Sequence, residues 1–177
     1  MLLADRIKSA IRDVEGYPRP GIVFKDITPV LADPVLMTDI VESMLSTYRG
    51  QNIDVVAAIE ARGFILGSIL AHELGCSLVP VRKAGKLPFT TRREKYDLEY
   101  GTAEIEVHTD AFAPGSRVLV HDDLLATGGT AAAAGKLIKS LGAEVAGFSF
   151  LVNLGFLDGE RNILKQFGIV PDFLVKY

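Results

Sequence analysis

Two segments of the chain repeat the order apolar strand, helix, apolar strand, and this repeat restricts the possible folds more than any other feature. Residues 53–59 and 117–121 are apolar with little polar alternation, which is typical of strands buried inside a parallel sheet. The first strand is followed by a helical pattern over 63–74 and a strand over 78–81, the second by a helix over 130–141 and a strand over 145–152. Such crossover units predict an α/β fold, with a mostly parallel central sheet flanked by helices and ligands at the carboxyl ends of its strands.

The N-terminal segment has a different pattern. Leu3, Ile7, Ile11 and Val14 recur at helical spacing, so we expect an amphipathic helix that ends at the glycine and proline residues of 16–21. The stretch that follows, up to Pro29, mixes apolar and polar residues without a clear period. Its aromatic and apolar side chains need a surface on which to lie.

Two further segments complete the pattern. A helix is expected to begin at Asp33-Pro34, with one apolar face formed by Leu36, Ile40, Met44 and Leu45. Between residues 82 and 100 the periodicity is lost among glycine, proline, threonine and charged residues, and 103–107 alternates like a strand. We expect the middle of this segment, residues 84–94, to be a mobile loop.

The composition narrows the class of protein. The chain has 177 residues, of which 49% are hydrophobic and 23% charged, so we expect a single domain spanning 1–177. A net charge of -3 argues against a broad basic surface for nucleic acid, so an anionic partner should be small. The apolar runs are too short to cross a membrane, and Asp5 and Arg6 interrupt a secretory signal. With one cysteine, Cys76, and no internal disulfide, we expect a cytoplasmic protein.

Residues 118–130 carry the strongest chemical signal. An apolar strand is followed by two adjacent acids, Asp122 and Asp123, which need a partner such as sugar hydroxyls or a divalent cation. Small residues then bring backbone amides close to a phosphate at the start of a helix; they are Ala126, Thr127, Gly128, Gly129 and Thr130. A solvated turn with a helix-capping loop would explain each part separately, but not the combination. The run is neither a Walker loop nor a three-glycine dinucleotide motif.

Two basic segments also follow predicted strands. Arg62 precedes Gly63 at the start of a helix, where its guanidinium could bind phosphate in two places, although an Arg-Gly pair alone equally fits a surface position. Six of the fourteen residues 82–95 are basic. A charge run is often only a solvated face, but this one begins at a strand end, where a departing diphosphate would need neutralisation. We favour Arg82, Lys83 and Lys86 as diphosphate contacts and leave Arg92, Arg93 and Lys95 open.

The run over residues 118–130 resembles the phosphoribosyl diphosphate binding motif of type I phosphoribosyltransferases. This resemblance implies that Asp122 and Asp123 hold the ribose hydroxyls and that residues 126–130 hold the 5′-phosphate. It also implies that Arg62 belongs to the loop that binds the pyrophosphate. The fold implied is the type I phosphoribosyltransferase fold, with a small N-terminal hood over about 1–33 and a mobile loop at the active site.

Three further stretches, residues 24–29, 82–88 and 96–101, resemble the members of this family that use adenine. By this resemblance Phe24 would stack on adenine, and backbone groups near Val23 and Lys25 would bind its amino edge. Glu99 would act as the catalytic residue that supports proton movement at N7 of the base. A core aromatic at Phe24 and a surface acid at Glu99 are the alternatives that the residues themselves leave open.

The reaction implied joins adenine to 5-phosphoribosyl 1-diphosphate and yields AMP and diphosphate. The resemblance also implies Mg²⁺ bound mainly through the diphosphate, with no assigned protein ligand, and a homodimer. Another base, namely hypoxanthine, xanthine, guanine or orotate, remains an alternative. A transcriptional regulator with this fold is disfavoured because no helix-turn-helix segment is present. His121 stands where the family has an apolar residue, and could be a neutral core residue or a donor to the two acids.

Overall fold

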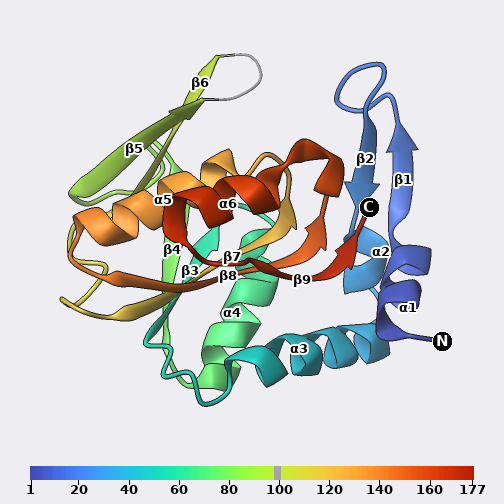
Figure 1. Ribbon diagram of the computed structural model, residues 1–177, viewed down its shortest axis with the longest axis horizontal. Helices are drawn as coiled ribbons and strands as arrows, with labels where there is room; N and C mark the ends of the chain where they lie inside the picture. Colours follow the sequence, from blue (N-terminus) through green and yellow to red (C-terminus); the bar gives the residue numbers. More distant parts are fainter. Residues whose placement is uncertain (98–100) are drawn as a thin grey trace.

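The computed structural model describes residues 1–97 and 101–177. Across the main sheet the described strands follow the order β5 (Thr91–Asp97), β6 (Thr102–His108), β4 (Ser77–Lys83), β3 (Val55–Ile59), β7 (Arg117–Leu125), β8 (Glu144–Asn153) and β9 (Asp172–Lys176) (Figure 1). The five strands from β4 to β9 are parallel, and β5 and β6 join antiparallel at one edge. The predicted α/β fold with a mostly parallel sheet is confirmed.

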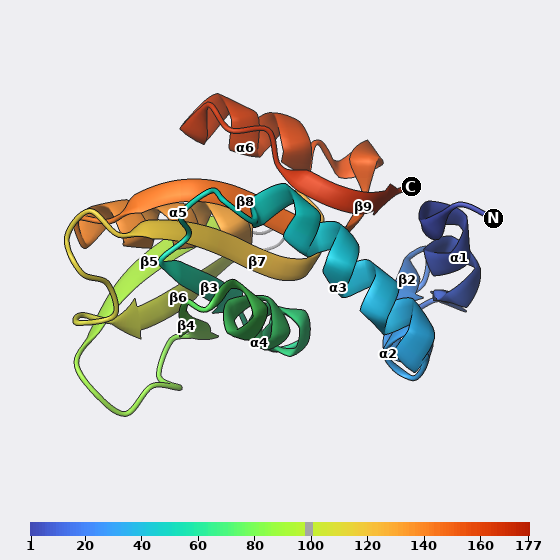
Figure 2. The ribbon, with the colours of Figure 1, turned by 90° about the horizontal axis from the view of Figure 1, so that it is seen from below.

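Helices cover both faces of this sheet. α3 (Pro34–Tyr48) and α4 (Gly63–Leu74) lie on one face, and α5 (Gly129–Ser140) and α6 (Gly159–Phe167) on the other (Figure 2). The side chains of β3 alternate between the two layers, because Val56 packs with the first pair of helices and Ala57 with the second. Burial on both faces explains why this strand has no polar alternation in the sequence.

The N-terminal segment forms a small substructure beside the end of the main sheet. It consists of α1 (Leu3–Ala10), β1 (Arg12–Glu15), β2 (Val23–Asp26) and α2 (Thr28–Leu31). The prediction of one helix through Val14 was wrong: the helix ends at Ala10, and Val14 lies in β1 opposite Phe24 of β2. Antiparallel pairing with β2 satisfies the backbone groups of 12–15, and the Asp13 carboxylate accepts a 2.7 Å hydrogen bond from Lys25.

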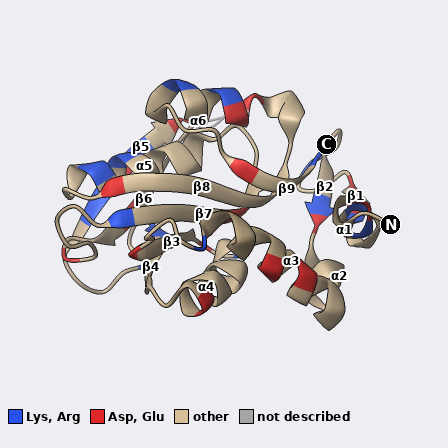
Figure 3. Ribbon diagram, turned by 60° about the horizontal axis from the view of Figure 1, so that its bottom comes forward, with Lys and Arg blue, Asp and Glu red and all other residues tan. Residues whose placement is uncertain are grey.

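The expected loop over residues 84–94 was also partly wrong. Residues from Thr91 onward form β5, which pairs antiparallel with β6 from Thr91 opposite His108 to Asp97 opposite Thr102. β5 is an edge strand, and Figure 3 shows basic residues along it. Charged side chains are common on edge strands and hide the apolar alternation that identifies a strand. Residues 84–90 remain without helix or strand, as expected.

The sequence-based prediction ended at residue 152, and three further elements follow this residue in the structure, the first of which is the short 3-10 helix η1 (Gly155–Leu157). The other two are α6 and β9, and β9 pairs parallel to β8. α6 buries Ile163 against the sheet and ends at Phe167; the next residue, Gly168, has a left-handed φ of 71°, which suits glycine. No helix in the described part of the chain combines the length and hydropathy needed to cross a membrane.

Candidate functional site

The carboxyl ends of β3 and β7 lie next to each other, because these two strands are parallel neighbours. Residues 60–63 leave β3 and begin α4, while Asp122 and Asp123 lie in the second half of β7. The prediction that the acids follow the strand was wrong in detail, since β7 continues to Leu125 and pairs with β8 up to that residue. The acids therefore lie on a fixed strand backbone rather than on a loop.

An ion pair joins the two segments. The Arg62 Nε atom lies 2.5 Å from the Asp123 Oδ2 atom, although the two residues are 61 positions apart. The Asp123 side chain is 4% exposed and that of Arg62 is 44% exposed, so the arginine covers the acid from the solvent side. The structure thus brings the predicted anion-binding arginine against one of the predicted ribose-binding acids.

The two acids have unlike environments. Burial raises the pKa of Asp122 well above its ordinary value, and the neighbouring charge of Asp123 raises it further. The Asp122 Oδ1 atom accepts a 2.8 Å hydrogen bond from the Asp123 backbone amide. Asp123 has the arginine as its partner, so the pair presents a paired carboxylate beside one that retains a proton more readily.

Gly63 allows the start of α4 to approach His121 and Asp122 of β7 closely. A Cβ atom at this position would lie 2.8 Å from the Asp122 Oδ1 atom, 3.0 Å from the Asp122 Cα atom and 3.1 Å from the His121 carbonyl oxygen. The first turn of α4 therefore packs directly on the acid-bearing strand. The helix N-terminus, which attracts anions, points into the same region.

The loop after β7 encloses a small cavity of about 70 Å³. Residues 126–131 line it together with Asp122, Leu124, Leu125 and Phe150. Gly128 has a φ of 80°, a left-handed conformation that glycine adopts readily, and α5 begins at the next residue. The structure therefore places Ala126, Thr127, Gly128, Gly129 and Thr130 around one cavity at the N-terminus of a helix, as the sequence predicts.

Glu60 binds the start of the basic segment, residues 82–86, which begins at the end of β4. The Glu60 Oε2 atom accepts a 3.1 Å hydrogen bond from Arg82 Nε and a 2.9 Å bond from the Lys83 backbone amide. Arg82 also donates from Nη1 to the Lys86 carbonyl oxygen at 3.1 Å. Glu60 thus joins the loop after β3 to the last two residues of β4, and the side chains of Lys83 and Lys86 are exposed.

Glu106 organises the same loop and was missed by the sequence analysis. It is fully buried on β6, and its Oε1 atom accepts from the backbone amides of Lys86 and Leu87, both at 2.9 Å. Its Oε2 atom accepts from Thr91 and from Arg93 Nε, at 3.1 and 3.0 Å. Burial acts to raise its pKa, but the hydrogen bonds outweigh this effect and lower the pKa to about 2. An acid within an alternating strand gives no sign in the sequence that it points inward.

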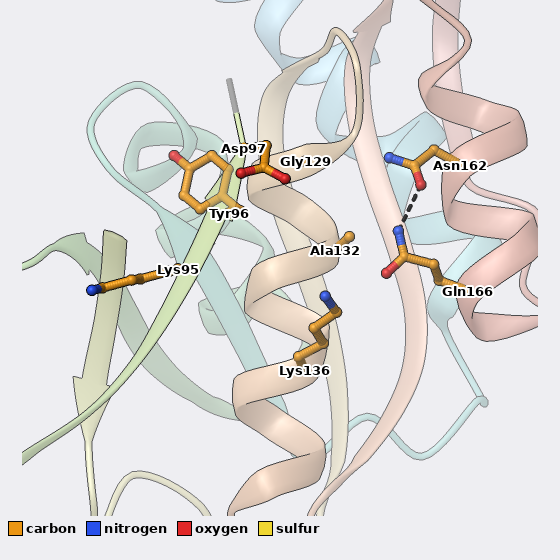
Figure 4. Close-up of a pocket in the computed structure, with 8 residues that line it drawn as sticks. All are labelled: Lys95, Tyr96, Asp97, Gly129, Ala132, Lys136, Asn162 and Gln166. Atoms are coloured by element: carbon orange, nitrogen blue, oxygen red, sulfur yellow. Dashed lines mark hydrogen bonds between the residues drawn. The ribbon is translucent and has the colours of Figure 1, made fainter. Parts of the chain in front are cut away.

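The three basic residues left open lie on β5. Arg93 is paired with Glu106 and also lies 3.8 Å from Glu104. Arg92 is exposed, and Lys95 lines a hollow between β5, α5 and α6 (Figure 4). Arg93 is therefore part of the support of the loop, whereas the side chains of Arg92 and Lys95 are exposed.

Three of the residues expected to act on the base, Val23, Phe24 and Lys25, lie on β2. The Phe24 ring packs edge-to-face on Tyr17 with centroids 5.3 Å apart, and the Arg62 guanidinium lies 5.3 Å from the Phe24 centroid. The Lys25 ammonium donates to Asp13 and lies 4.0 Å from the Tyr177 ring, so the Lys25 side chain is engaged within the N-terminal and C-terminal segments. Val23 is 46% exposed. Glu99 lies outside the described residues.

His121 behaves as a neutral core residue. It is fully buried, and burial lowers its pKa to about 4. Neither of its ring nitrogens has a hydrogen-bond partner among the described residues, so it is not a donor to Asp122 or Asp123. Of the two alternatives that the sequence left open, the structure supports the neutral side chain.

Comparison with known proteins gives a consistent result. The model of the phosphoribosyl transferase domain matches residues 31–166. A protein of Acidothermus cellulolyticus named adenine phosphoribosyltransferase is 52% identical over 161 residues, which cover 91% of this chain and 91% of that protein. One of Anaeromyxobacter dehalogenans with the same name is 50% identical, covering 91% of this chain and 94% of the relative.

Solved structures agree. Adenine phosphoribosyltransferase from Rhodothermus marinus superimposes with a TM-score of 0.94 at 47% identity, covering 99% of this chain and 98% of that one. The enzyme of the same name from Saccharomyces cerevisiae, solved with an iminoalditol bisphosphate and adenine, gives 0.88 at 35% identity, covering 97% of this chain and 98% of that one.

Proposed function

The chain belongs to the phosphoribosyl transferase family, and we propose that it transfers the 5-phosphoribosyl group from 5-phosphoribosyl 1-diphosphate to adenine. The products are AMP and diphosphate, and the reaction serves purine salvage. The observation that carries this proposal is the position of Arg62, which contacts the Phe24 ring and the Asp123 carboxylate. One side chain thereby connects the surface suited to a purine with the acids suited to a ribose.

The chemical difficulty is a ribose carbon that becomes cation-like as the diphosphate departs. Asp122 and Asp123 would hold the ribose hydroxyls, and the amides of residues 126–130 would hold the 5′-phosphate, so that the sugar is fixed at two ends. Arg62, Arg82, Lys83 and Lys86 would stabilise the negative charge that develops on the leaving diphosphate. The ion pair between Arg62 and Asp123 then has to rearrange as the sugar enters.

The base would lie on the N-terminal hood, residues 1–33, within a single domain. The Phe24 ring would stack on adenine, and the backbone near Val23 and Lys25 would bind its amino edge, since the Lys25 side chain is already engaged elsewhere. Glu99 would hold the proton at N7 while N9 attacks the ribose. We propose that the loop over residues 84–90 closes on the bound substrates and excludes water.

Mg²⁺ would enter with the diphosphate sugar. No group of three or more potential metal-binding side chains occurs among the described residues. Mg²⁺ keeps several waters and is usually bound through substrate phosphates rather than by a full set of protein ligands, so we assign it no protein ligand. When bound, the ion would neutralise charge on the diphosphate.

The setting of the enzyme is proposed as a cytoplasmic homodimer. Cys76 is a free thiol, which suits a compartment that keeps thiols reduced. Burial raises the pKa of this thiol. Sedimentation equilibrium of the purified chain tests the dimer, and a mass of one chain at micromolar concentration would refute it. Cell fractionation tests the location.

Initial rates with five bases test the proposed reaction. With 5-phosphoribosyl 1-diphosphate and Mg²⁺ present, we expect rapid AMP formation from adenine and little product from hypoxanthine, xanthine, guanine or orotate. Rapid use of another base with negligible use of adenine would replace the proposed substrate. A salt-sensitive complex with DNA and no transfer to any base would replace the enzyme by a regulator.

A further inference from the structure

The start of α6 forms the rear wall of the loop over residues 126–130. A Cβ atom on Gly128 would lie 2.9 Å from the Gly159 carbonyl oxygen, and a side chain on Gly159 would collide with the Ala126 carbonyl oxygen. The two backbones are therefore in direct contact. This contact places the first turn of α6 against the side of the loop that lies away from the cavity, because no residue of α6 lines that cavity.

One side chain of α6 is hydrogen-bonded to the loop. The Asn162 Nδ2 atom donates to the Thr127 carbonyl oxygen at 2.9 Å. Gln166, one turn later on the same helix, donates from Nε2 to Asn162 Oδ1 at 2.6 Å (Figure 4). Because its oxygen accepts this second bond, the Asn162 amide is held with its NH₂ group toward the loop.

The helix that carries Asn162 is itself fixed. Ile163 is fully buried, and the Phe167 ring packs on Phe148 with centroids 5.1 Å apart. Phe167 also fills the space beside Gly135 of α5, where a Cβ atom would lie 2.5 Å from its ring. A hydrogen bond from such a helix restrains the loop in a way that a bond from solvent does not.

The restraint acts on one particular peptide group. The peptide between Thr127 and Gly128 is trans, so its C=O and N–H point in opposite directions. When the C=O is held toward α6, the Gly128 N–H is turned away from α6 and toward the cavity. We propose that Asn162 is a positioning residue that aims the Gly128 amide at the 5′-phosphate, and that Gln166 orients Asn162 for this task.

The inference rests on the proposed role of residues 126–130 as the phosphate loop. If the inference is correct, α6 raises the affinity for the 5′-phosphate without touching the substrate. The residues proposed to bind the base and the diphosphate lie on other elements, so their affinities should not depend on Asn162.

The test compares ribose 5-phosphate binding by calorimetry in the wild-type protein, Asn162→Ala, Asn162→Asp and Gln166→Ala. Loss of one neutral hydrogen bond predicts a dissociation constant about fivefold higher for Asn162→Ala, with a similar rise in KM for 5-phosphoribosyl 1-diphosphate and no change in KM for adenine. Gln166→Ala should raise the constant about twofold, since Asn162 keeps its donor but loses its orientation. Lys165→Ala, on the exposed side of the same helix, is the matched control and should bind as the wild type does.

Asn162→Asp separates positioning from mere packing. Its ionised carboxylate cannot donate to Thr127, so binding should be weaker than in Asn162→Ala at a pH of about 8. As the pH is lowered toward about 4, the ordinary pKa of an aspartate, a growing fraction of protonated acid regains a donor, and the ratio of the variant's dissociation constant to that of the wild type should fall. A ratio independent of pH, or unchanged affinity in Asn162→Ala, would overturn the inference. Failure of the wild-type protein itself to bind ribose 5-phosphate would overturn the proposed function and the inference with it.

Discussion

Gly63→Ala offers a direct test of how the acid-bearing strand and the first turn of α4 depend on each other. The added Cβ atom would meet Asp122 Oδ1 at 2.8 Å, but it would also meet two backbone atoms, Asp122 Cα at 3.0 Å and the His121 carbonyl oxygen at 3.1 Å. A side chain can rotate away, whereas this backbone is paired with β3 on one side and β8 on the other. The helix must therefore move outward, away from the acids.

The expected change in the free energy of unfolding follows from two opposing effects. Overpacking costs about 1–3 kcal/mol, and alanine favours a helix over glycine by about 1 kcal/mol, which leaves a net loss of roughly 1 kcal/mol. In a chain of this size we expect Tm to fall by about 2–4 °C. Because Arg62 immediately precedes Gly63 and would move outward with the helix, away from Asp123 and from the proposed diphosphate site, KM for 5-phosphoribosyl 1-diphosphate should rise about tenfold.

Gly67→Ala is the matched control for this experiment. It lies on the same helix and is also overpacked, with its Cβ atom 2.6 Å from that of Ala58, but it does not touch the acids. Differential scanning calorimetry and steady-state kinetics on both variants should show a loss of stability in both and a loss of sugar affinity only in Gly63→Ala. An equal change of KM in the two variants, or none in either, would refute the reasoning.

Three further predictions concern single groups. His121→Leu should reduce the loss of stability between pH 6.5 and about 4 by up to about 3 kcal/mol, because the buried histidine has a folded pKa below its unfolded one and its contribution disappears as pH falls through that window; denaturant unfolding across this range measures it, and an unchanged slope would contradict it. Glu106→Gln should weaken inhibition by diphosphate, because the Lys86 amide and Arg93 lose a charged acceptor. In the wild-type protein the ionised Glu106 also contributes to the free energy of unfolding, and this contribution is lost as the pH falls from 4.5 toward about 2. Wild-type inhibition by diphosphate would exclude the role in the loop. Glu99→Leu should lower kcat with little change in the affinity for 5-phosphoribosyl 1-diphosphate, and pre-steady-state rates at saturating substrate measure this; unchanged turnover would remove Glu99 from catalysis.

The parts of the fold that the sequence predicted well are those where a local pattern records burial. The uninterrupted apolar run before Glu60 predicted β3, and the helix predicted over 63–74 has the observed bounds of α4. β5 was missed because its charged residues reflect an edge position, which depends on the topology of the whole sheet. Val14 fits a helical spacing, but it pairs with Phe24 of a strand that no local pattern around Val14 records.

The site divides in the same way. The adjacent acids and the small residues after them form a continuous motif, so they could be found without a structure. The ion pair between Arg62 and Asp123 joins residues 61 positions apart, and the inward direction of Glu106 depends on the register of β6. Asn162 lies on a helix with no recognisable motif, and its hydrogen bonds with Thr127 and Gln166 become visible only in the structure.

The dependence of the phosphate loop on α6 also has a consequence for the order of events during synthesis on the ribosome. Both acids and residues 126–130 are translated before any residue of α6, and the first turn of this helix packs against the loop at Ala126 and Gly128. A nascent chain that has reached residue 157 therefore carries the complete sequence motif while its Thr127 carbonyl has no Asn162 to hold it. Affinity for a sugar phosphate is therefore expected to reach its full value only after the segment from Gly159 to Phe167 has been synthesised and has packed against Gly135.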